Sequence, residues 1–274
     1  MFDIKSFYEA DSVEDAIAAL TADPQSQVIS GGTDVLIRVR EGKDAGRGLV
    51  SIHNIPELKG VSLEEDGTII IRPATSFSHI TNDPIIKKHL SMLGEAVDQV
   101  GGPQVRNTAT IGGNICNGAT SADSASTMCA LNAAVVLKGP EGVREVPVTE
   151  FYTGPGRTVR KQNEVCTAFK ITRENYEGWE GHYIKYGKRR AMEIATLGCA
   201  VRVKLSPDKT VLEDVRLAYG VAAPTPVRCY EAEEALRGKQ VSDATIYDLF
   251  ADKALSQVNP VSYTHLTLPT KLEV

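Results

Sequence analysis

The sequence of 274 residues predicts an α+β protein, and three observations lead to this fold class. Apolar residues recur at helical spacing in several separate segments, which indicates amphipathic helices. Alternating strand patterns stand in pairs around turn residues, which indicates antiparallel hairpins. One predicted strand also leads through a Gly-Gly pair into a helix, and a second Gly-Gly pair follows about eighty residues later. This mixture of elements is typical of the α+β class.

Composition and charge narrow the class of protein. Hydrophobic residues make up 42% of the chain and charged residues 24%, as is ordinary for a globular protein with a core. A net charge of −5 without a basic stripe argues against nucleic-acid binding. No apolar stretch approaches the ~20 residues of a membrane span, and the N-terminus has no apolar signal region. Neither a membrane segment nor a secretion signal is therefore predicted.

The five cysteines are predicted to be reduced thiols. They are an odd number, widely spaced, and include no Cys-x-x-Cys pair, unlike a disulfide framework. The same spacing argues against an iron–sulfur cluster held by this chain alone. The five histidines have no metal-ligand spacing either. We therefore expect a cytoplasmic protein without a metal site.

The N-terminal segment predicts a helix, a strand and a second helix around the first glycine pair. Ser12 followed by Asp15 resembles a capping box, and apolar residues then repeat at helical spacing. Residues 27–29 are predicted as a buried strand that runs into Gly31 and Gly32, with a helix after them. This order directs backbone N–H groups and a helix dipole at a phosphate.

Later segments predict further strands and helices, a domain boundary and a tail. In order they are a strand over 49–52, a hairpin of 61–64 and 68–72, a helix over 86–100 that ends at Gly101-Gly102-Pro103, a hairpin of 133–137 and 143–146, a strand over 165–171, a hairpin of 197–205 and 211–219, and helices over 230–237 and 242–255. The polar segment 173–181 is the predicted domain boundary. Residues 261–274 fit neither a helix nor a strand pattern and are interpreted as a non-native tail.

The two glycine pairs are the candidate ligand site. A single glycine pair is most often only a tight turn, but these two pairs both continue into small polar residues. Without Cβ atoms, successive N–H groups can approach and hold a phosphate, so one ligand held from two sides is expected. The chain has no Gly-x-Gly-x-x-Gly run opening a strand–helix–strand unit and no P-loop motif. Neither a Rossmann site nor a P-loop is therefore indicated.

Two segments then give the chain a specific resemblance. Residues 28–36 (Val-Ile-Ser-Gly-Gly-Thr-Asp-Val-Leu) and 110–114 (Thr-Ile-Gly-Gly-Asn) resemble the two FAD-pyrophosphate loops of the molybdenum hydroxylase flavoproteins. The runs 111–125 and 219–228 are similar to the FAD-binding subunits of bacterial xanthine dehydrogenases. The similarity extends from Met1 to about Asn259.

The resemblance implies a fold with two domains. A vanillyl-alcohol-oxidase-type (PCMH-type) FAD-binding domain is expected over residues 1–176, in subdomains of about 1–58 and 59–176. A smaller α+β domain, with a three-stranded antiparallel sheet and helices, is expected over 177–260. The chain is expected to lack its native C-terminus.

The resemblance also implies which residues contact FAD, which is expected to bind without a covalent link. Two segments would surround the pyrophosphate and ribose, Val100 would lie beside the flavin ring, and Val165 or Cys166 would lie at the adenine. The expected FAD-binding residues are Val28, Ile29, Ser30, Gly31, Gly32, Thr33, Asp34, Val35, Leu36, Val100, Ala109, Thr110, Ile111, Gly112, Gly113, Asn114, Asp123, Val165, Cys166, Ile184 and Lys185.

Some of these residues allow a second interpretation. Asp123 can contact FAD or cap the helix that starts near Ser124, and the two roles are compatible. Cys116 would lie near the isoalloxazine by the resemblance, but a small buried thiol also explains it. Of the basic cluster, only Lys185 is expected to be a cation partner for the dinucleotide, while Lys188, Arg189 and Arg190 form a solvated face.

No catalytic side chain is expected, because no Ser/His/Asp arrangement or carboxylate pair stands out and the cofactor supplies the chemistry. The resemblance implies an electron-transfer subunit. Electrons from hypoxanthine or xanthine would leave a molybdopterin centre on one partner chain, cross [2Fe–2S] clusters on another, reach FAD here and pass to NAD⁺. The alternatives are the flavoprotein subunit of a carbon monoxide, nicotinate or other aldehyde or heterocycle dehydrogenase, a self-sufficient flavin oxidase, or a non-catalytic adaptor.

Overall fold

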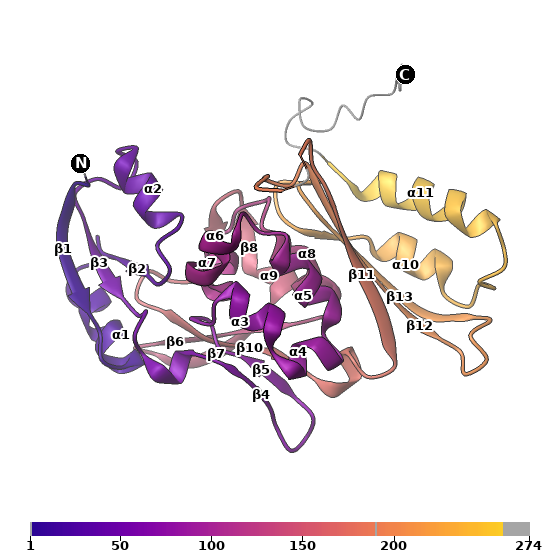
Figure 1. Cartoon of the computed structure of the whole chain (residues 1–274), viewed down its shortest axis with the longest axis horizontal. Helices are drawn as coiled ribbons and strands as arrows, with labels where there is room; N and C mark the ends of the chain where they lie inside the picture. The colour runs from indigo at the N-terminus through magenta and orange to yellow at the C-terminus, as the bar shows by residue number, and fades with distance from the viewer. Residues whose placement is uncertain (1, 190, 260–274) are drawn as a thin grey trace.

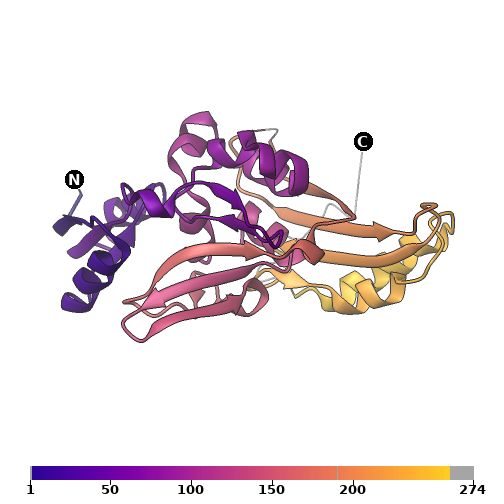
Figure 2. The same ribbon diagram turned by 90° about the horizontal axis from the view of Figure 1, so that it is seen from below.

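The computed structural model describes residues 2–189 and 191–259 and shows three larger sheets arranged along the molecule, besides a two-stranded sheet (Figure 1). A three-stranded sheet carries the N-terminus, a five-stranded sheet lies in the middle, and a four-stranded sheet carries the C-terminal helices. Figure 2 shows the same order from below, with the middle sheet flanked by the other two units. The predicted tail, 261–274, lies outside the described residues. No helix in the described part of the chain is long and apolar enough to cross a membrane.

The N-terminal unit is a parallel sheet in the order β1-β3-β2 with two helices. Its elements are β1 (Ile4–Glu9), α1 (Val13–Ala22), β2 (Gln27–Ile29), α2 (Val35–Arg40) and β3 (Arg47–Ser51). The predicted cap is confirmed, because the Asp15 N–H donates to Ser12 Oγ at 3.1 Å. The Asp15 carboxylate accepts instead from the Asp11 N–H, so the box is shifted by one residue. β1 was not predicted, because nearly all of its side chains are exposed and carry no burial pattern.

The middle sheet is antiparallel in the order β4-β5-β10-β6-β7, and the two predicted hairpins β4–β5 and β6–β7 are confirmed. Its strands are β4 (Val61–Leu63), β5 (Ile69–Ile71), β6 (Ala134–Gly139), β7 (Gly142–Pro147) and β10 (Val165–Ile171). Around it lie η1 (Pro56–Leu58), α3 (Phe77–Asn82), α4 (Pro84–His89), α5 (Ser91–Asp98), α6 (Pro103–Thr108), α7 (Ile111–Cys116), α8 (Asp123–Ala130), α9 (Val148–Phe151), β8 (Tyr152–Gly154), β9 (Arg157–Thr158) and η2 (Arg173–Asn175).

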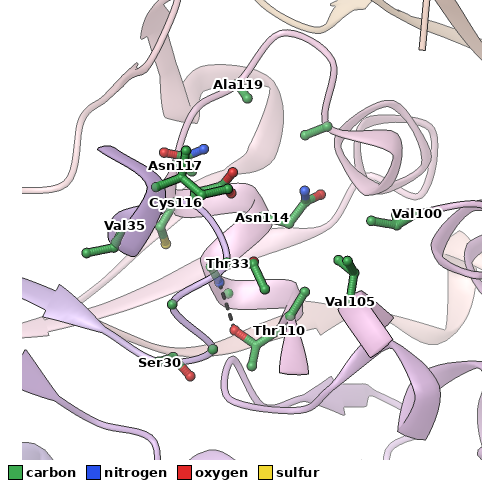
Figure 3. Close-up of a pocket in the computed structure, with 18 of the residues that line it drawn as sticks. Ser30, Thr33, Val35, Val100, Val105, Thr110, Asn114, Cys116, Asn117 and Ala119 are labelled. Atoms are coloured by element: carbon green, nitrogen blue, oxygen red, sulfur yellow. Dashed lines mark hydrogen bonds between the residues drawn. The ribbon is translucent and has the colours of Figure 1, made fainter. Parts of the chain in front are cut away.

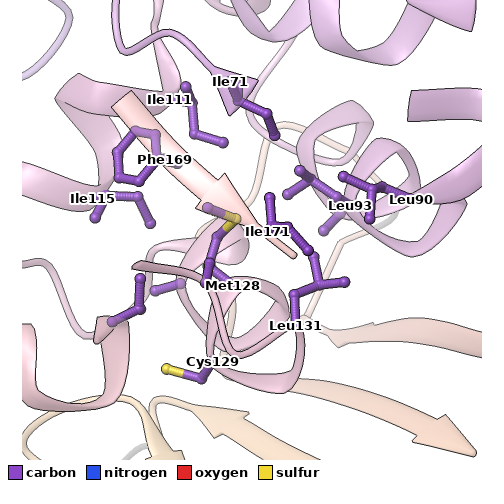
Figure 4. Close-up of a cluster of buried hydrophobic side chains, with 14 of the residues drawn as sticks. Ile71, Leu90, Leu93, Ile111, Ile115, Met128, Cys129, Leu131, Phe169 and Ile171 are labelled. Atoms are coloured by element: carbon purple, nitrogen blue, oxygen red, sulfur yellow. The ribbon is translucent and has the colours of Figure 1, made fainter. Parts of the chain in front are cut away.

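The main core lies between this sheet and the helices α3 to α8. Figure 4 shows Phe169 and Ile171 of β10 among Ile115 of α7, Met128 of α8 and Leu93 of α5. All five side chains are buried. Because strand and helices share this core, the helices that border the candidate site are fixed relative to the sheet.

The single helix predicted over 86–100 is wrong. Leu90, with φ −132° and ψ 40°, separates α4 from α5. The apolar stripe runs through this break, since Ile86, Leu93 and Val97 are all fully buried, and the pattern therefore hid the change of direction. After Gly102, Pro103 begins α6 at its first position, where a missing N–H costs nothing.

The C-terminal unit is an antiparallel sheet in the order β11-β12-β13-β14. Its elements are β11 (Trp179–Tyr186), β12 (Leu197–Leu205), β13 (Leu212–Gly220), β14 (Val227–Arg228), α10 (Tyr230–Leu236) and α11 (Thr245–Gln257). Three long strands match the expected three-stranded sheet, and the two-residue β14 adds a fourth. α10 packs against β13, while α5 packs against β11 and α8 against β12 and β13. The predicted division of the chain near residue 176 stays a prediction.

Candidate cofactor-binding site

A cleft of about 670 Å³ lies where the β2–α2 segment faces α6, α7 and the start of α8. This volume is within the range of small-molecule and cofactor sites. Ser30, Thr33 and Val35 of the first glycine segment line this cleft together with Thr110 and Asn114 of the second (Figure 3). The lining also includes Arg160, Glu164, Cys166, Val100, Asp123, Arg189, Met192, Glu193 and Ile194. The cleft can therefore hold an elongated ligand across its middle.

The first glycine segment offers a run of free backbone donors. None of the N–H groups from Gly31 to Val35 donates to a group within residues 2–189 and 191–259. Gly32 has φ +72°, a left-handed conformation that glycine adopts at no steric cost. Consecutive free N–H groups around such a residue form an anion-binding concavity. The segment is therefore suited to a phosphate or pyrophosphate.

Buried polar groups beside these donors also lack partners. The hydroxyl of Ser30 and the amide nitrogen of Gln27 line the cleft region and find no hydrogen bond in the described part of the chain. A buried polar group without a partner is rare in proteins. Both groups are therefore consistent with a ligand that completes the site.

At Gly31 the first glycine segment touches the backbone that directly precedes the second segment. A Cβ atom on Gly31 would lie 2.0 Å from the backbone oxygen of Thr108 and 3.1 Å from the Cα of Ala109. No side chain fits into that space. This glycine therefore lets two backbones meet on one side of the cleft.

The second glycine segment differs from the expected phosphate loop. It forms α7, and its first N–H groups are already used: Ile111 donates to Thr75 O, Gly112 to Pro73 O at 2.8 Å, and Gly113 to the Thr110 hydroxyl at 3.1 Å. A Cβ on Gly112 would lie 2.4 Å from Pro73 Cβ. The prediction that N–H groups of this segment form an anion nest is therefore wrong, because protein atoms occupy them.

What the second segment presents to the cleft is polar side-chain atoms. Asn114 accepts a hydrogen bond from the Ser124 hydroxyl at 2.6 Å through its amide oxygen. This bond leaves its amide nitrogen free to face a ligand, in the orientation that Figure 3 shows. The Thr110 oxygen, although it accepts from Gly113, keeps its own proton to donate.

Asp123 and Lys185 form a buried ion pair beside the cleft. The Lys185 ammonium lies 2.9 Å from Asp123 Oδ2 and 3.0 Å from the backbone oxygen of Gln99, and the two side chains are only 8% and 6% exposed. The Tyr183 hydroxyl donates to Asp123 Oδ1 at 2.6 Å. Burial raises the pKa of Asp123, and the Lys185 charge and the Tyr183 hydrogen bond partly oppose this shift.

This geometry bears on two interpretations from the sequence. Asp123 is the first residue of α8 and makes no capping hydrogen bond, so the capping interpretation is wrong. Lys185 does not line the cleft, because its ammonium is held by Asp123 and Gln99. Its direct contact with a ligand stays a prediction that would require it to leave these partners.

Most of the remaining predicted residues come together in the cleft. The predicted residues that line it are Val28, Ser30, Gly31, Gly32, Thr33, Asp34, Val35, Val100, Ala109, Thr110, Gly112, Gly113, Asn114, Asp123 and Cys166. Of the others, Ile29, Ile111 and Val165 are buried in hydrophobic cores, and Ile184 is 54% exposed on β11. Leu36 packs toward Gly32. The side chains of these five residues therefore lie away from the lining.

Sequence reasoning missed the polar residues at the Cys166 region. Arg160 lines the cleft, and its NH1 group donates to the backbone oxygens of Lys161, Gln162 and Glu164. The Glu164 carboxylate accepts two hydrogen bonds from Arg144, at 2.7 and 2.8 Å, which lower its pKa. These residues follow no motif, and only the crossing of β10 behind the cleft brings them there.

Two thiols meet in the same region. Cys116 at the end of α7 and Cys166 on β10 both line the cleft, and the Cys166 thiol donates to the backbone oxygen of Ala168 at 3.9 Å. The neighbouring Cys166 lowers the pKa of the Cys116 thiol, with a further contribution from Arg160. Burial raises the pKa of Cys166. Cys116 thus lies beside Cys166, the residue expected at the adenine, and its expected position near the isoalloxazine stays a prediction.

Comparison with known proteins assigns this chain to a family. A model of the "FAD binding domain in molybdopterin dehydrogenase" matches residues 2–173, and one of the "CO dehydrogenase flavoprotein C-terminal domain" matches residues 182–266. The chain is 42% identical to the xanthine dehydrogenase FAD-binding subunit of Escherichia coli O157:H7, over 96% of this chain and 89% of that protein.

More distant relatives share the same extent. The chain is 31% identical to the nicotinate dehydrogenase FAD-subunit of Eubacterium barkeri, over 88% of this chain and 82% of that protein. A solved structure of carbon monoxide dehydrogenase from Hydrogenophaga pseudoflava superimposes with a TM-score of 0.90 at 30% identity, covering 97% of this chain and 91% of that one. The fold, the cleft and these matches together show that the chain belongs to the family of FAD-binding flavoproteins of the molybdopterin dehydrogenases.

Proposed function

We propose that this protein is the FAD-binding electron-transfer subunit of a cytoplasmic molybdenum hydroxylase of the xanthine dehydrogenase type. It would receive electrons of hypoxanthine or xanthine oxidation from [2Fe–2S] clusters on one partner subunit, while another holds molybdopterin, and would deliver them to NAD⁺. The observation that carries the proposal is the run of free N–H groups from Gly31 to Val35 at the cleft of a chain in this family. The 42% identity to a xanthine dehydrogenase subunit supports the purine substrate.

The residues of the cleft fit FAD. The free N–H groups would hold the pyrophosphate, and the Thr110 hydroxyl and Asn114 amide would reach the adjoining sugar-like chain. When bound, FAD supplies a ring that accepts electrons singly or in pairs and can pass a hydride onward. The protein contributes orientation and exclusion of water.

The ring would lie where Val100 and Val105 make an apolar wall of the cleft. Asp123 and Lys185 would position this region, because Lys185 connects the ends of α5, at Gln99, and of α8, at Asp123. Gln99 directly precedes Val100. The ion pair would therefore set the wall against which the ring packs.

Exposed apolar side chains support a partner subunit beside this region. Ile184 and Tyr186 alternate on the exposed face of β11, and Met192 and Ile194 follow in the segment that borders the cleft. Clustered exposed apolar residues often mark protein interfaces. We propose that the iron–sulfur partner covers them.

The experiment that tests the proposal has two steps. The purified chain is incubated with FAD and its flavin absorbance is measured after removal of free cofactor; we expect about one FAD per chain. The chain is then produced together with its partner subunits, and the complex is supplied with xanthine and NAD⁺. NADH formation is expected, and a chain without flavin would overturn the proposal.

Controls separate the finer alternatives. Flavin reduction by xanthine with the isolated chain would identify a self-sufficient oxidase and contradict an electron-transfer role. Peroxide formation in place of NADH would replace NAD⁺ by oxygen as acceptor. Turnover of nicotinate but not xanthine would move the chain to a different branch of the family.

A further inference from the structure

We propose that Gln27 is the residue that recognises the base of the bound dinucleotide and so distinguishes FAD from FMN. This inference rests on the proposed function, since it places the adenine of FAD in the cleft region around Cys166. Three features of the structure support it: the unpaired amide nitrogen of Gln27, its position relative to the phosphate-binding donors, and the walls around it.

The amide of Gln27 is unusual for a partly buried glutamine. Its nitrogen is shielded from water and forms no hydrogen bond to any group in residues 2–189 and 191–259. The nearby Gln162 gives the contrast, because its amide nitrogen donates to the backbone oxygens of Leu20, Asp23 and Ser26 at 3.1 to 3.3 Å. Gln162 therefore ties the structure together, whereas the amide nitrogen of Gln27 has no partner among the described residues.

The position of Gln27 follows from its strand. Gln27 begins β2, and Ser30, at the start of the free-donor segment, lies three residues further on. A strand rises about 3.3 Å per residue, so the two residues are ~10 Å apart along the chain. A nucleoside attached to a phosphate at Gly31 to Val35 can span this separation. Gln27 therefore stands where the base of that nucleoside would end.

The surroundings suit a flat aromatic base. Val28, Ile52 and Cys166 line the cleft and offer apolar contact. Arg160 also lines it, and its three hydrogen bonds to backbone oxygens hold the guanidinium in place. A fixed guanidinium plane stacks well on an aromatic ring.

The chemistry of an amide matches adenine. A glutamine side chain presents a donor and an acceptor side by side, and adenine presents an amino donor next to a ring-nitrogen acceptor. One bidentate contact would thus satisfy both ends of the Gln27 amide. FMN ends at its phosphate and has no base, so it would make no use of Gln27.

The test compares FAD and FMN binding to the cofactor-free full chain by quenching of flavin fluorescence. In Gln27→Met, which keeps the length of the side chain but removes both hydrogen bonds, we expect FAD to bind about tenfold more weakly. The affinity for FMN is expected to stay unchanged. Gln25→Met is the matched control, because Gln25 is exposed on the preceding loop and should leave both affinities unaltered.

Each outcome is decisive. An unchanged FAD affinity in Gln27→Met, or an equal loss of FAD and FMN affinity, would overturn the role of Gln27. If Gln27→Met does not fold, Gln27→Glu, which keeps the shape and loses the donor, replaces it with the same expected selectivity for FAD loss over FMN loss. A wild-type chain that binds no FAD at all would instead reject the proposed function.

Discussion

The segment from Ser30 to Val35 and the segment from Thr110 to Cys116 both contain a Gly-Gly pair, and both border the cleft. In the first, the backbone N–H groups are free and Gly32 adopts φ +72°. In the second, the N–H groups are bound to Pro73, Thr75 and the Thr110 hydroxyl within a helix. The same pair of residues therefore leaves backbone donors free in one place and permits tight packing in the other. The absence of a Cβ lets other atoms come close to the glycine backbone, and the surrounding fold determines whether those are protein atoms or a ligand.

The largest effect is expected for Gly31→Ala, which tests whether the first segment must lie against Thr108 and Ala109, directly before the second. The added Cβ would lie 2.0 Å from Thr108 O, so the segments would have to separate and the donor run would lose its geometry. We expect the purified protein to retain almost no flavin, as measured by absorbance relative to protein. Gly94→Ala is the control, because a Cβ there makes only an ordinary contact at 3.5 Å with Ile86. Wild-type flavin content in Gly31→Ala would contradict the contact.

Gly112→Val tests whether the second glycine pair serves packing. Its Cβ would overlap Pro73, and such overpacking is expected to lower the free energy of unfolding by about 3 kcal/mol. The midpoint of thermal or urea unfolding measures this loss. Because no N–H of Gly112 is available to a phosphate, molecules that remain folded should still bind FAD. Normal stability combined with loss of FAD would instead favour a direct phosphate contact at Gly112.

The smallest effect of the three is expected for Lys185→Met. This variant tests whether the Asp123–Lys185 ion pair stabilises α8, which contacts the second segment. Without the ammonium, the charge of buried Asp123 loses its cationic partner, and we expect the free energy of unfolding to fall by about 2 kcal/mol. This loss is smaller than for a charge that must persist, because Asp123 can take up a proton. The pKa of Asp123 is already raised by burial and would rise further. A carboxyl whose pKa is raised on folding loses stabilisation as the pH rises through that pKa.

The pH dependence of unfolding tests whether the loss of stability in Lys185→Met grows as the pH rises. The difference in unfolding free energy between wild type and Lys185→Met is expected to be small near pH 4, where Asp123 can be protonated, and to grow toward pH 8. Lys188→Met, at an exposed position, serves as the control and should show no such dependence. If the difference stays constant from about pH 4 to about pH 8, the stabilising effect of Lys185 does not come from its ion pair with Asp123.

Local signals in the sequence predicted most elements of the fold. The Ser12 cap, the β6–β7 hairpin and the β12–β13 hairpin follow from residues that are close in the chain, and the structure confirms them. The sequence did not predict β1, because its side chains are exposed and it is held by backbone pairing to β3. The break at Leu90 escaped because the buried stripe continues across it.

The sequence by itself determined the family resemblance, the two glycine segments and the order of most elements, since these depend on residue type and local spacing. Only the tertiary structure decided which glycine segment has free donors, that Lys185 is held by Asp123, and that Gln27 and Arg160 border the same cleft. The physical reason is that a hydrogen-bond donor is free or used according to its neighbours in space. Those neighbours come from segments as distant as Pro73 and Gly112, or Gln27 and Cys166, which no local pattern connects.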